Sequence, residues 1–168
     1  MRDESKRYPE GLLLPALSAC GARPTLITLC GLRQAQLGFR FVHLGPTKQC
    51  LGCDLLRFCQ GRLQEGRIYV VVALRQKVFP CAVHEGGVRA VEVEEATVQA
   101  VVPVRLAIEG AVILFNQQEC DMQSCPSSRE CHPVGLFNGD RCQVLSLLAR
   151  VDCPKGRELR TALLKRTP

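Results

Sequence analysis

The stretch Cys50-Leu-Gly-Cys-Asp-Leu-Leu-Arg-Phe-Cys59 decides the organisation of the chain, because a later segment repeats its cysteine spacing. There are two sets of four cysteines: Cys50, Cys53, Cys59 and Cys81, then Cys120, Cys125, Cys131 and Cys153. In both sets the third cysteine follows the second by six positions and the fourth follows the third by 22. The first gap is three positions in one set and five in the other. These matched intervals predict an internal duplication with a period of about 72 residues.

Two equal sets of four cysteines predict two tetrathiolate metal sites. Four soft thiolates around one centre suit zinc or an iron–sulfur cluster. Zinc ribbons usually present a close cysteine pair in each arm, and bacterial ferredoxins show a close run of cysteines. Neither set fits either pattern fully, so the spacing leaves both metals open. The spacing also leaves open whether the fourth cysteine closes the site of its own half or that of the other half, as in two-cluster ferredoxins.

Chain length and charge agree with a metal-stabilised protein. The chain has 168 residues, 46% of them apolar, so each repeat of about 70 residues has a marginal core of its own. A structural metal would contribute folding free energy on the order of 10 kcal/mol. The formal charge of +6 falls to about +2 once two sites have each added about −2. A balance this small is weak evidence for nucleic-acid binding. The basic residues that crowd the C-terminal end are expected to be solvated: Lys155, Arg157, Arg160, Lys165 and Arg166.

The N-terminal segment, residues 1–24, is expected to be a poorly ordered extension. Leu17-Ser-Ala-Cys20 resembles a lipoprotein cleavage box, but acidic and basic residues are mixed before it and Pro15 interrupts the apolar run. No run approaches the ~20 apolar residues that a membrane span requires. Export would also expose eight thiols to oxidation. The sequence therefore favours a cytoplasmic protein with reduced cysteines.

Strand patterns occur in both repeats and predict a mostly β fold, with a small α+β fold left open. The predicted strands span residues 25–30, 38–44, 68–72, 88–93, 97–104, 110–115 and 142–151. Each half reads as strand, cysteine-bearing loop, glycine turn, strand and final cysteine. A short helix is expected at 157–164. We therefore expect internally duplicated strands related by a pseudo-twofold axis, with the first half at 25–103, the second at 104–168 and one metal loop in each.

The remaining candidates have plainer explanations. Cys20, Cys30 and Cys142 lie outside the two sets and are expected to be buried small residues or free thiols. His84 and His132 follow candidate ligands and are expected to be loop histidines rather than ligands. The turn from residue 84 to 89 contains two glycines and needs no anion to explain it. A phosphate-binding glycine loop, an H-E-x-x-H motif and a serine elbow are all missing from the sequence, so a redox or binding protein is favoured over an enzyme.

Several short motifs together resemble an archaeal family catalogued only as uncharacterised (the UPF series). In the first half they are Cys50-x2-Cys53-x5-Cys59, Gly66-Arg67-x-Tyr69 and Pro80-Cys81-x2-His84-Glu-Gly-Gly-Val-Arg89. In the second half they are Ala107-Ile-Glu-Gly-Ala111, Cys131-His-Pro-x-Gly-Leu136 and Cys153-Pro-Lys-Gly156. The resemblance covers about residues 25–168. It implies two cysteine clusters that act as iron–sulfur redox centres, with no established activity. The extension 1–24 is unusual for that family.

The leading hypothesis is a protein with two four-cysteine iron–sulfur centres, each held by one of the two sets, that serves electron transfer or redox sensing with an unknown redox or protein partner. The alternative is a module stabilised by two zinc ions, without redox activity, that binds nucleic acid or a protein. Its nucleic-acid version would use the basic C-terminal residues. No membrane partner is expected.

Overall fold

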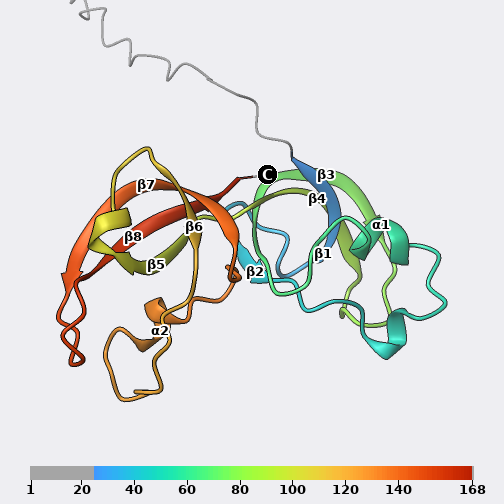
Figure 1. The fold of residues 1–168 in the computed structure, drawn as a ribbon. Coiled ribbons are helices and arrows are strands. Elements are labelled where there is room, and N and C mark those ends of the chain that lie inside the picture. The colour runs from blue at the N-terminus through green and yellow to red at the C-terminus, as the bar shows by residue number, and fades with distance from the viewer. Residues whose placement is uncertain (1–24, 168) are drawn as a thin grey trace, which may run out of the picture.

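The computed structural model describes residues 25–167, which form two four-stranded antiparallel sheets side by side (Figure 1). The first sheet, in the order β1-β4-β3-β2, contains β1 (Leu26–Gly31), β2 (Arg40–Val42), β3 (Ile68–Phe79) and β4 (Val88–Glu95). The second, in the order β5-β8-β7-β6, contains β5 (Val98–Pro103), β6 (Val112–Phe115), β7 (Asp140–Val151) and β8 (Leu159–Arg166). The helical segments are short: η1 (Lys48–Cys50), α1 (Leu56–Gln60), η2 (Val104–Leu106) and α2 (Ser128–Cys131).

The two sheets repeat one another strand for strand, which agrees with the predicted duplication. β1 to β4 correspond in order and pairing to β5 to β8. The registers correspond too, since Leu26 faces Val93 in the first sheet and Val98 faces Leu164 in the second. The helices α1 and α2 begin at positions 56 and 128, which are 72 residues apart. The predicted mostly β fold is therefore confirmed, the two matching sheets are consistent with a duplicated fold, and all seven predicted strands are present with shifted ends.

The long strands β3 and β7 carry equivalent irregularities. Their register shifts against β4 and β8 in two places each. An extra residue in a strand leaves backbone groups without ladder partners. In the first sheet Arg89 Nε donates to the carbonyl oxygen of Arg75 at 2.6 Å, and in the second Arg160 Nε donates to that of Leu148 at 2.9 Å. The sequence predicts that this strand ends at residue 72, whereas β3 continues to Phe79. The bulges interrupt the alternation of apolar and polar residues, so the second part of the strand lacks the pattern by which a strand is predicted.

The predicted helix at 157–164 is wrong, because this segment forms most of β8. The strand pairs with β5 on one side and β7 on the other. Leu159, Ala162 and Leu164 are buried there at 5%, 0% and 0% exposure. The spacing of Leu159, Ala162 and Leu163 matches a helical face, but a strand that fills the middle of a sheet buries more apolar area. Tertiary pairing has overridden the local pattern.

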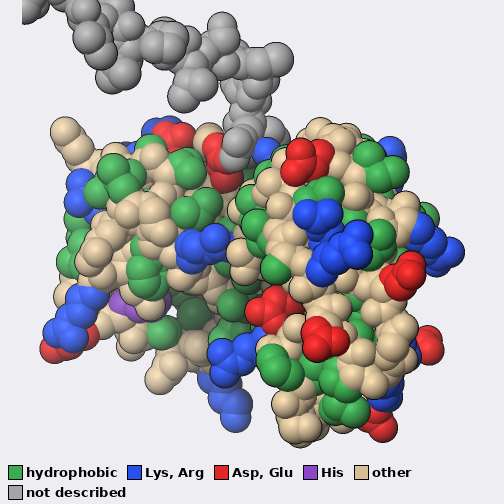
Figure 2. All heavy atoms as spheres, turned by 90° about the vertical axis from the view of Figure 1, so that its left-hand side faces the viewer, with side chains coloured by type: hydrophobic (Ala, Val, Ile, Leu, Met, Phe, Trp, Pro, Cys, Tyr) green, Lys and Arg blue, Asp and Glu red, His purple; other side chains and the backbone are tan. Residues whose placement is uncertain are grey.

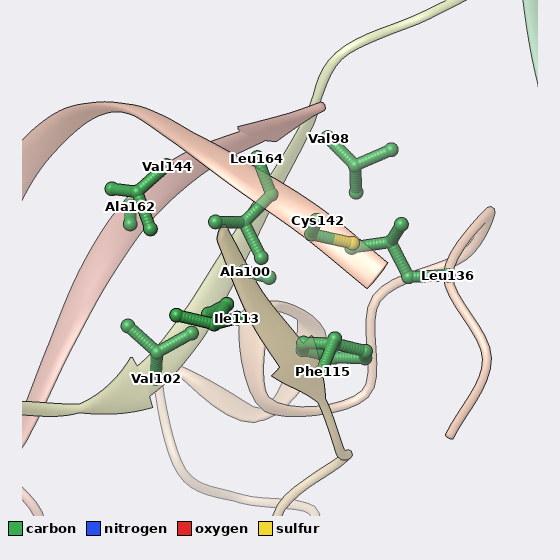
Figure 3. Packing of buried hydrophobic residues seen from close by; sticks show 10 residues of the cluster. All are labelled: Val98, Ala100, Val102, Ile113, Phe115, Leu136, Cys142, Val144, Ala162 and Leu164. Atoms are coloured by element: carbon green, nitrogen blue, oxygen red, sulfur yellow. The ribbon is translucent and has the colours of Figure 1, made fainter. Parts of the chain in front are cut away.

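The cores lie within the curled sheets. In the second half ten buried residues form one cluster (Figure 3): Val98, Ala100, Val102, Ile113, Phe115, Leu136, Cys142, Val144, Ala162 and Leu164. The first half has a smaller cluster: Cys30, Ala35, Tyr69, Val71, Val91 and Val93. The sequence pattern places the end of the first half at residue 103. Strand β5 pairs with β8 in the second sheet, so the two sheets divide between Glu95 and Val98.

Two ion pairs join the halves. Arg67 lies just before β3 and is 6% exposed. Its guanidinium makes two hydrogen bonds to the Asp140 carboxylate, one of them at 2.8 Å, lies 4.2 Å from the centre of the Phe137 ring and donates to the carbonyl of Gly135 at 3.1 Å. Arg166, at the end of β8, contacts Glu95 at 2.6 Å. These four residues bind the two sheets into one unit.

Candidate metal centres

The first site is defined by Cys50, Cys53, Cys59 and Cys81, which reach one end of the first sheet from separate segments. Cys50 ends η1, Cys53 follows in a turn, Cys59 lies in α1 and Cys81 follows β3. Cys59 and Cys81 pack against one small apolar cluster, whose buried members are Leu29, Val88 and Ala90. Cys81 therefore lies with the cysteines of its own half.

The other three thiols of the first site act on Cys59. The pKa of Cys59 is raised, first by burial and then by the neighbouring Cys50, Cys81 and Cys53, although the Gln60 side chain acts to lower it. Mutual repulsion of this kind is what a metal relieves when it takes up several thiolates.

Polar groups approach the sulfur atoms of the first site. The Gln60 amide nitrogen donates to Cys59 Sγ at 3.4 Å, and the backbone N–H of Val83 donates to Cys81 Sγ, also at 3.4 Å. Thr47 Oγ1 lies 3.5 Å from Cys50 Sγ. Hydrogen bonds to sulfur favour the thiolate and tune a bound metal centre.

The second site is defined by Cys120, Cys125, Cys131 and Cys153, and it repeats this arrangement on the second sheet. Cys131, at the end of α2, packs with Val101 and Leu159, and Cys153 joins the same cluster from the loop after β7. All four cysteines line one cavity of about 20 Å³. A single buried water requires roughly 10–15 Å³ by the same kind of measure, so the cavity has room for one water-sized ion.

Burial and neighbouring groups also shift the pKa values of two cysteines at the second site. The pKa of Cys131 is raised, first by burial and then by Cys125, Cys120 and Cys153. The pKa of Cys153 is lowered, because the backbone N–H groups of Arg157 and Lys155 hydrogen-bond to its sulfur. The N–H of Lys155 thus repeats the contact of Val83 in the first half.

Within residues 25–167 no group of three or more His, Cys, Asp or Glu side chains is arranged tightly enough to hold a metal ion as it stands. The four cysteines of the second set nevertheless line one cavity, and those of the first set are close enough to act on Cys59. The donor chemistry fits a thiolate-bound metal, since each set has four sulfurs, free thiols and donors aimed at sulfur. Ligation by these eight cysteines stays a prediction.

The other candidates take up structural positions. Cys30 and Cys142 are buried, and burial raises the pKa of each thiol to about 11. Cys20 lies outside the described residues. His84 packs over Gly31, where an added Cβ would lie 2.6 Å from its Nδ1, and His132 Nε2 lies 3.0 Å from the carbonyl oxygen of Cys120. These positions agree with loop histidines and buried thiols.

The glycine pair between His84 and β4 forms a turn. The N–H of Gly87 donates to the carbonyl of His84 at 3.0 Å, and both Gly86 and Gly87 have positive φ. A Cβ at Gly87 would lie 2.4 Å from the carbonyl oxygen of Phe79, so only glycine allows this close approach. The turn interpretation of this segment therefore explains both glycines.

The basic C-terminal residues have partners inside the protein. Lys155 contacts Asp121, Arg157 contacts the Glu119 carbonyl, and Arg160 and Arg166 have the partners described above. On the face of the second half in Figure 2, Lys and Arg side chains are interspersed with Asp and Glu. The basic side chains that were expected to be solvated thus mostly contact other groups of the protein. Sequence reasoning missed Lys155 and Arg157 as neighbours of the second site, although they follow Cys153 by two and four positions.

No helix in the described part of the chain is long and apolar enough to cross a membrane. The expectation of a cytoplasmic location stays a prediction.

Comparison with known proteins identifies relatives but no solved structure. A family model described as an uncharacterised protein family (UPF0179) matches residues 26–164. A UPF0179 protein of Archaeoglobus fulgidus is 38% identical over 84% of this chain and 94% of its own length. Those of Methanothermobacter thermautotrophicus and Pyrococcus furiosus are each 36% identical, over 83% and 82% of this chain and 97% and 93% of their own lengths. No solved structure matches the chain.

Proposed function

The chain belongs to the uncharacterised archaeal protein family UPF0179, and we propose that it carries two four-cysteine iron–sulfur centres that serve electron transfer or redox sensing. The observation that carries the proposal is the gathering of four thiols at the same place in each half. In each half they come from a turn region, a short helix and a loop after the long strand. A repeated core alone does not require this.

The surroundings of the thiols support a bound metal. All ten described cysteines are free, and of these only Cys30 and Cys142 lie within strands. The other eight lie at the two sites, where backbone N–H groups donate to Cys81 and Cys153. Hydrogen bonds to sulfur set the potential of iron–sulfur centres.

In this proposal each half holds one centre with its own four cysteines. A bound cluster would supply the one-electron chemistry. The chain's own residues would hold it, shield it on one side with the apolar clusters around Leu29 and Val101, and donate hydrogen bonds to its sulfur ligands.

A zinc ion in each site is the second candidate, in a module that binds a protein or nucleic acid without redox activity. The cavity of about 20 Å³ at the second site favours a single ion, because a cluster would require the loops to move apart. Four of the five basic residues near the C-terminus have partners within the chain, so a protein partner fits this candidate better than nucleic acid does.

Metal and sulfide analysis separates the candidates. We expect anaerobically purified protein to be brown, with iron and acid-labile sulfide, and to lose about half of each when one set of cysteines is changed to serine. A colourless protein with about two zinc ions would replace the leading candidate by the second. Protein without bound metal, under conditions that load a known metalloprotein, would contradict both.

A further inference from the structure

We propose that Lys155 and Arg157 form a latch that preassembles the second site, so that this site takes up metal before the first. The inference rests on the proposed function, because it concerns the same thiols. It adds an order of loading and names the residues that set it.

The latch joins two loops that are more than thirty residues apart. Lys155 Nζ contacts Asp121 Oδ1 at 2.6 Å, and Arg157 Nη2 donates to the Glu119 carbonyl at 2.8 Å. Asp121 and Glu119 are the two residues that flank Cys120. The backbone N–H groups of the same Lys155 and Arg157 hydrogen-bond to the sulfur of Cys153. Two residues therefore hold Cys120 and Cys153 near each other.

A third contact fixes the same loop. His132, which follows Cys131, places Nε2 3.0 Å from the carbonyl oxygen of Cys120. The segment around Cys120 has no helix or strand of its own, so these contacts hold it in place together with the Gln118 N–H, which donates to the Cys131 carbonyl at 3.2 Å. Together they tie Cys120 to the segments that carry Cys131 and Cys153.

The first site has no equivalent of the latch. Lys155 and Arg157 correspond, 72 positions earlier, to Val83 and Glu85. Val83 has no polar side chain, and Glu85 contacts Arg33 at 2.8 Å instead. Among residues 25–167 no side-chain hydrogen bond or ion pair joins the loop of Cys81 to that of Cys50.

Preassembly favours metal uptake because the cost of ordering the loops has already been met. The latch also brings the positive charge of Arg157, which contacts a neutral carbonyl, to a site that gains negative charge when four thiolates bind one divalent ion; the charge of Lys155 is offset by Asp121. Hydrogen-bonding neighbours of metal ligands typically change metal affinity by about 10–100-fold. Because Asp121 is 92% exposed, we expect a change in metal affinity near the lower end of this range.

The order of loading can be measured on the unaltered chain. Reduced, metal-free protein receives one equivalent of Cd²⁺, is alkylated with N-ethylmaleimide and is mapped by peptide mass spectrometry. We expect protection of Cys120, Cys125, Cys131 and Cys153 to exceed that of the first set by about tenfold. Equal protection, or preferred protection of the first set, would overturn the latch and leave the proposed function standing. Failure of Cd²⁺ to protect either set would overturn both.

Variants test whether Lys155 and Arg157 are the cause. In K155A/R157A we expect the preference for the second site to disappear, and in the metal-free protein we expect Cys120 to be alkylated several times faster. K165A is the control, because it removes a basic side chain of β8 that does not line the second site, and it should leave both measurements unchanged. Circular dichroism checks that the variants fold. A folded double variant that keeps the wild-type order and alkylation rate would refute the assignment.

Discussion

The two halves share one backbone plan but fill equivalent positions differently. Thr28, His43 and Tyr69 in the first half correspond to Ala100, Phe115 and Cys142 in the second, and all six are buried. The first half therefore places polar groups where the second places apolar ones. At the cysteine sites the difference is reversed, since the second half has charged contacts where the first has Val83. Duplication has preserved strand order and thiols, while the interactions that support them have diverged.

Two of these polar side chains in the first half, Thr28 and Tyr69, have hydrogen-bond partners. Thr28 Oγ1 donates to the carbonyl of Cys59 at 2.6 Å, and the Tyr69 hydroxyl accepts from the N–H of Gln64 at 2.9 Å. Buried polar groups contribute to stability only when they are hydrogen-bonded. The Thr28 contact also ties α1, and so Cys59, to the first sheet. Each half thus supports its site by its own means.

The largest expected effect is at the junction between the halves. Arg67→Ala removes one partner of an ion pair whose side chains are 7% and 11% exposed, and it should destabilise the protein by about 3–5 kcal/mol because the Asp140 charge stays buried without its partner. Urea unfolding at matched metal content measures this. Arg166→Ala, at a pair exposed by 27% and 25%, is the comparison and should cost less. Equal losses would mean that burial does not distinguish the two pairs.

A second substitution makes the first half resemble the second. Thr28→Ala introduces the residue found at position 100 and should cost about 1–2 kcal/mol, because the Cys59 carbonyl loses its donor in a buried place. We also expect weaker Cd²⁺ binding at the first site alone, measured by the protection of its cysteines. Ala100→Thr is the reciprocal variant and should be destabilising, since it inserts a hydroxyl into an apolar core. A Thr28→Ala protein of unchanged stability would contradict this account.

A third test concerns a feature that the halves share. Arg89→Ala and Arg160→Ala each remove the side-chain donor at a strand bulge and should cost about 0.5–1 kcal/mol. Thermal unfolding of both variants compares the two sheets directly. Similar losses are expected because the contacts are equivalent. A loss in one half only would show that the bulges are no longer equivalent in energy.

The smallest expected effect is the contribution of Asp140 to the pH dependence of stability. Burial acts to raise its pKa, but hydrogen bonds from Arg67 and the Phe137 N–H overcome burial and leave the pKa below its usual value. A lowered folded pKa contributes stability above the unfolded pKa of about 3.9, and this stability is lost as pH falls through the folded value. Denaturation measured from pH 6 to 3 should show this loss in the wild type. The loss should be smaller in Asp140→Asn, and equal slopes would exclude Asp140 as a source.

The sequence predicts the parts of the fold that have a local or repeated pattern. The cysteine spacing predicts the duplication, and the β-branched runs predict seven strands. The sequence predicts a helix where β8 forms, because the apolar spacing there fits both a helix and a strand, and only pairing with β5 and β7 decides between them. Contacts such as Arg67 with Asp140, or Lys155 with Asp121, join segments that no local pattern relates. They depend on the folded arrangement.

The ion pairs at the junction also constrain the history of the molecule. Arg67 and Asp140 occupy corresponding places before and at the start of β3 and β7, and Glu95 and Arg166 are the last residues of β4 and β8. Each residue therefore meets its own counterpart, as in an isologous dimer. Two identical copies of one half would set like residues against each other at both places. Residues of opposite charge at these places require that the two copies mutate separately. The two ion pairs therefore arose after the copies had become separate genes or the two halves of one fused gene.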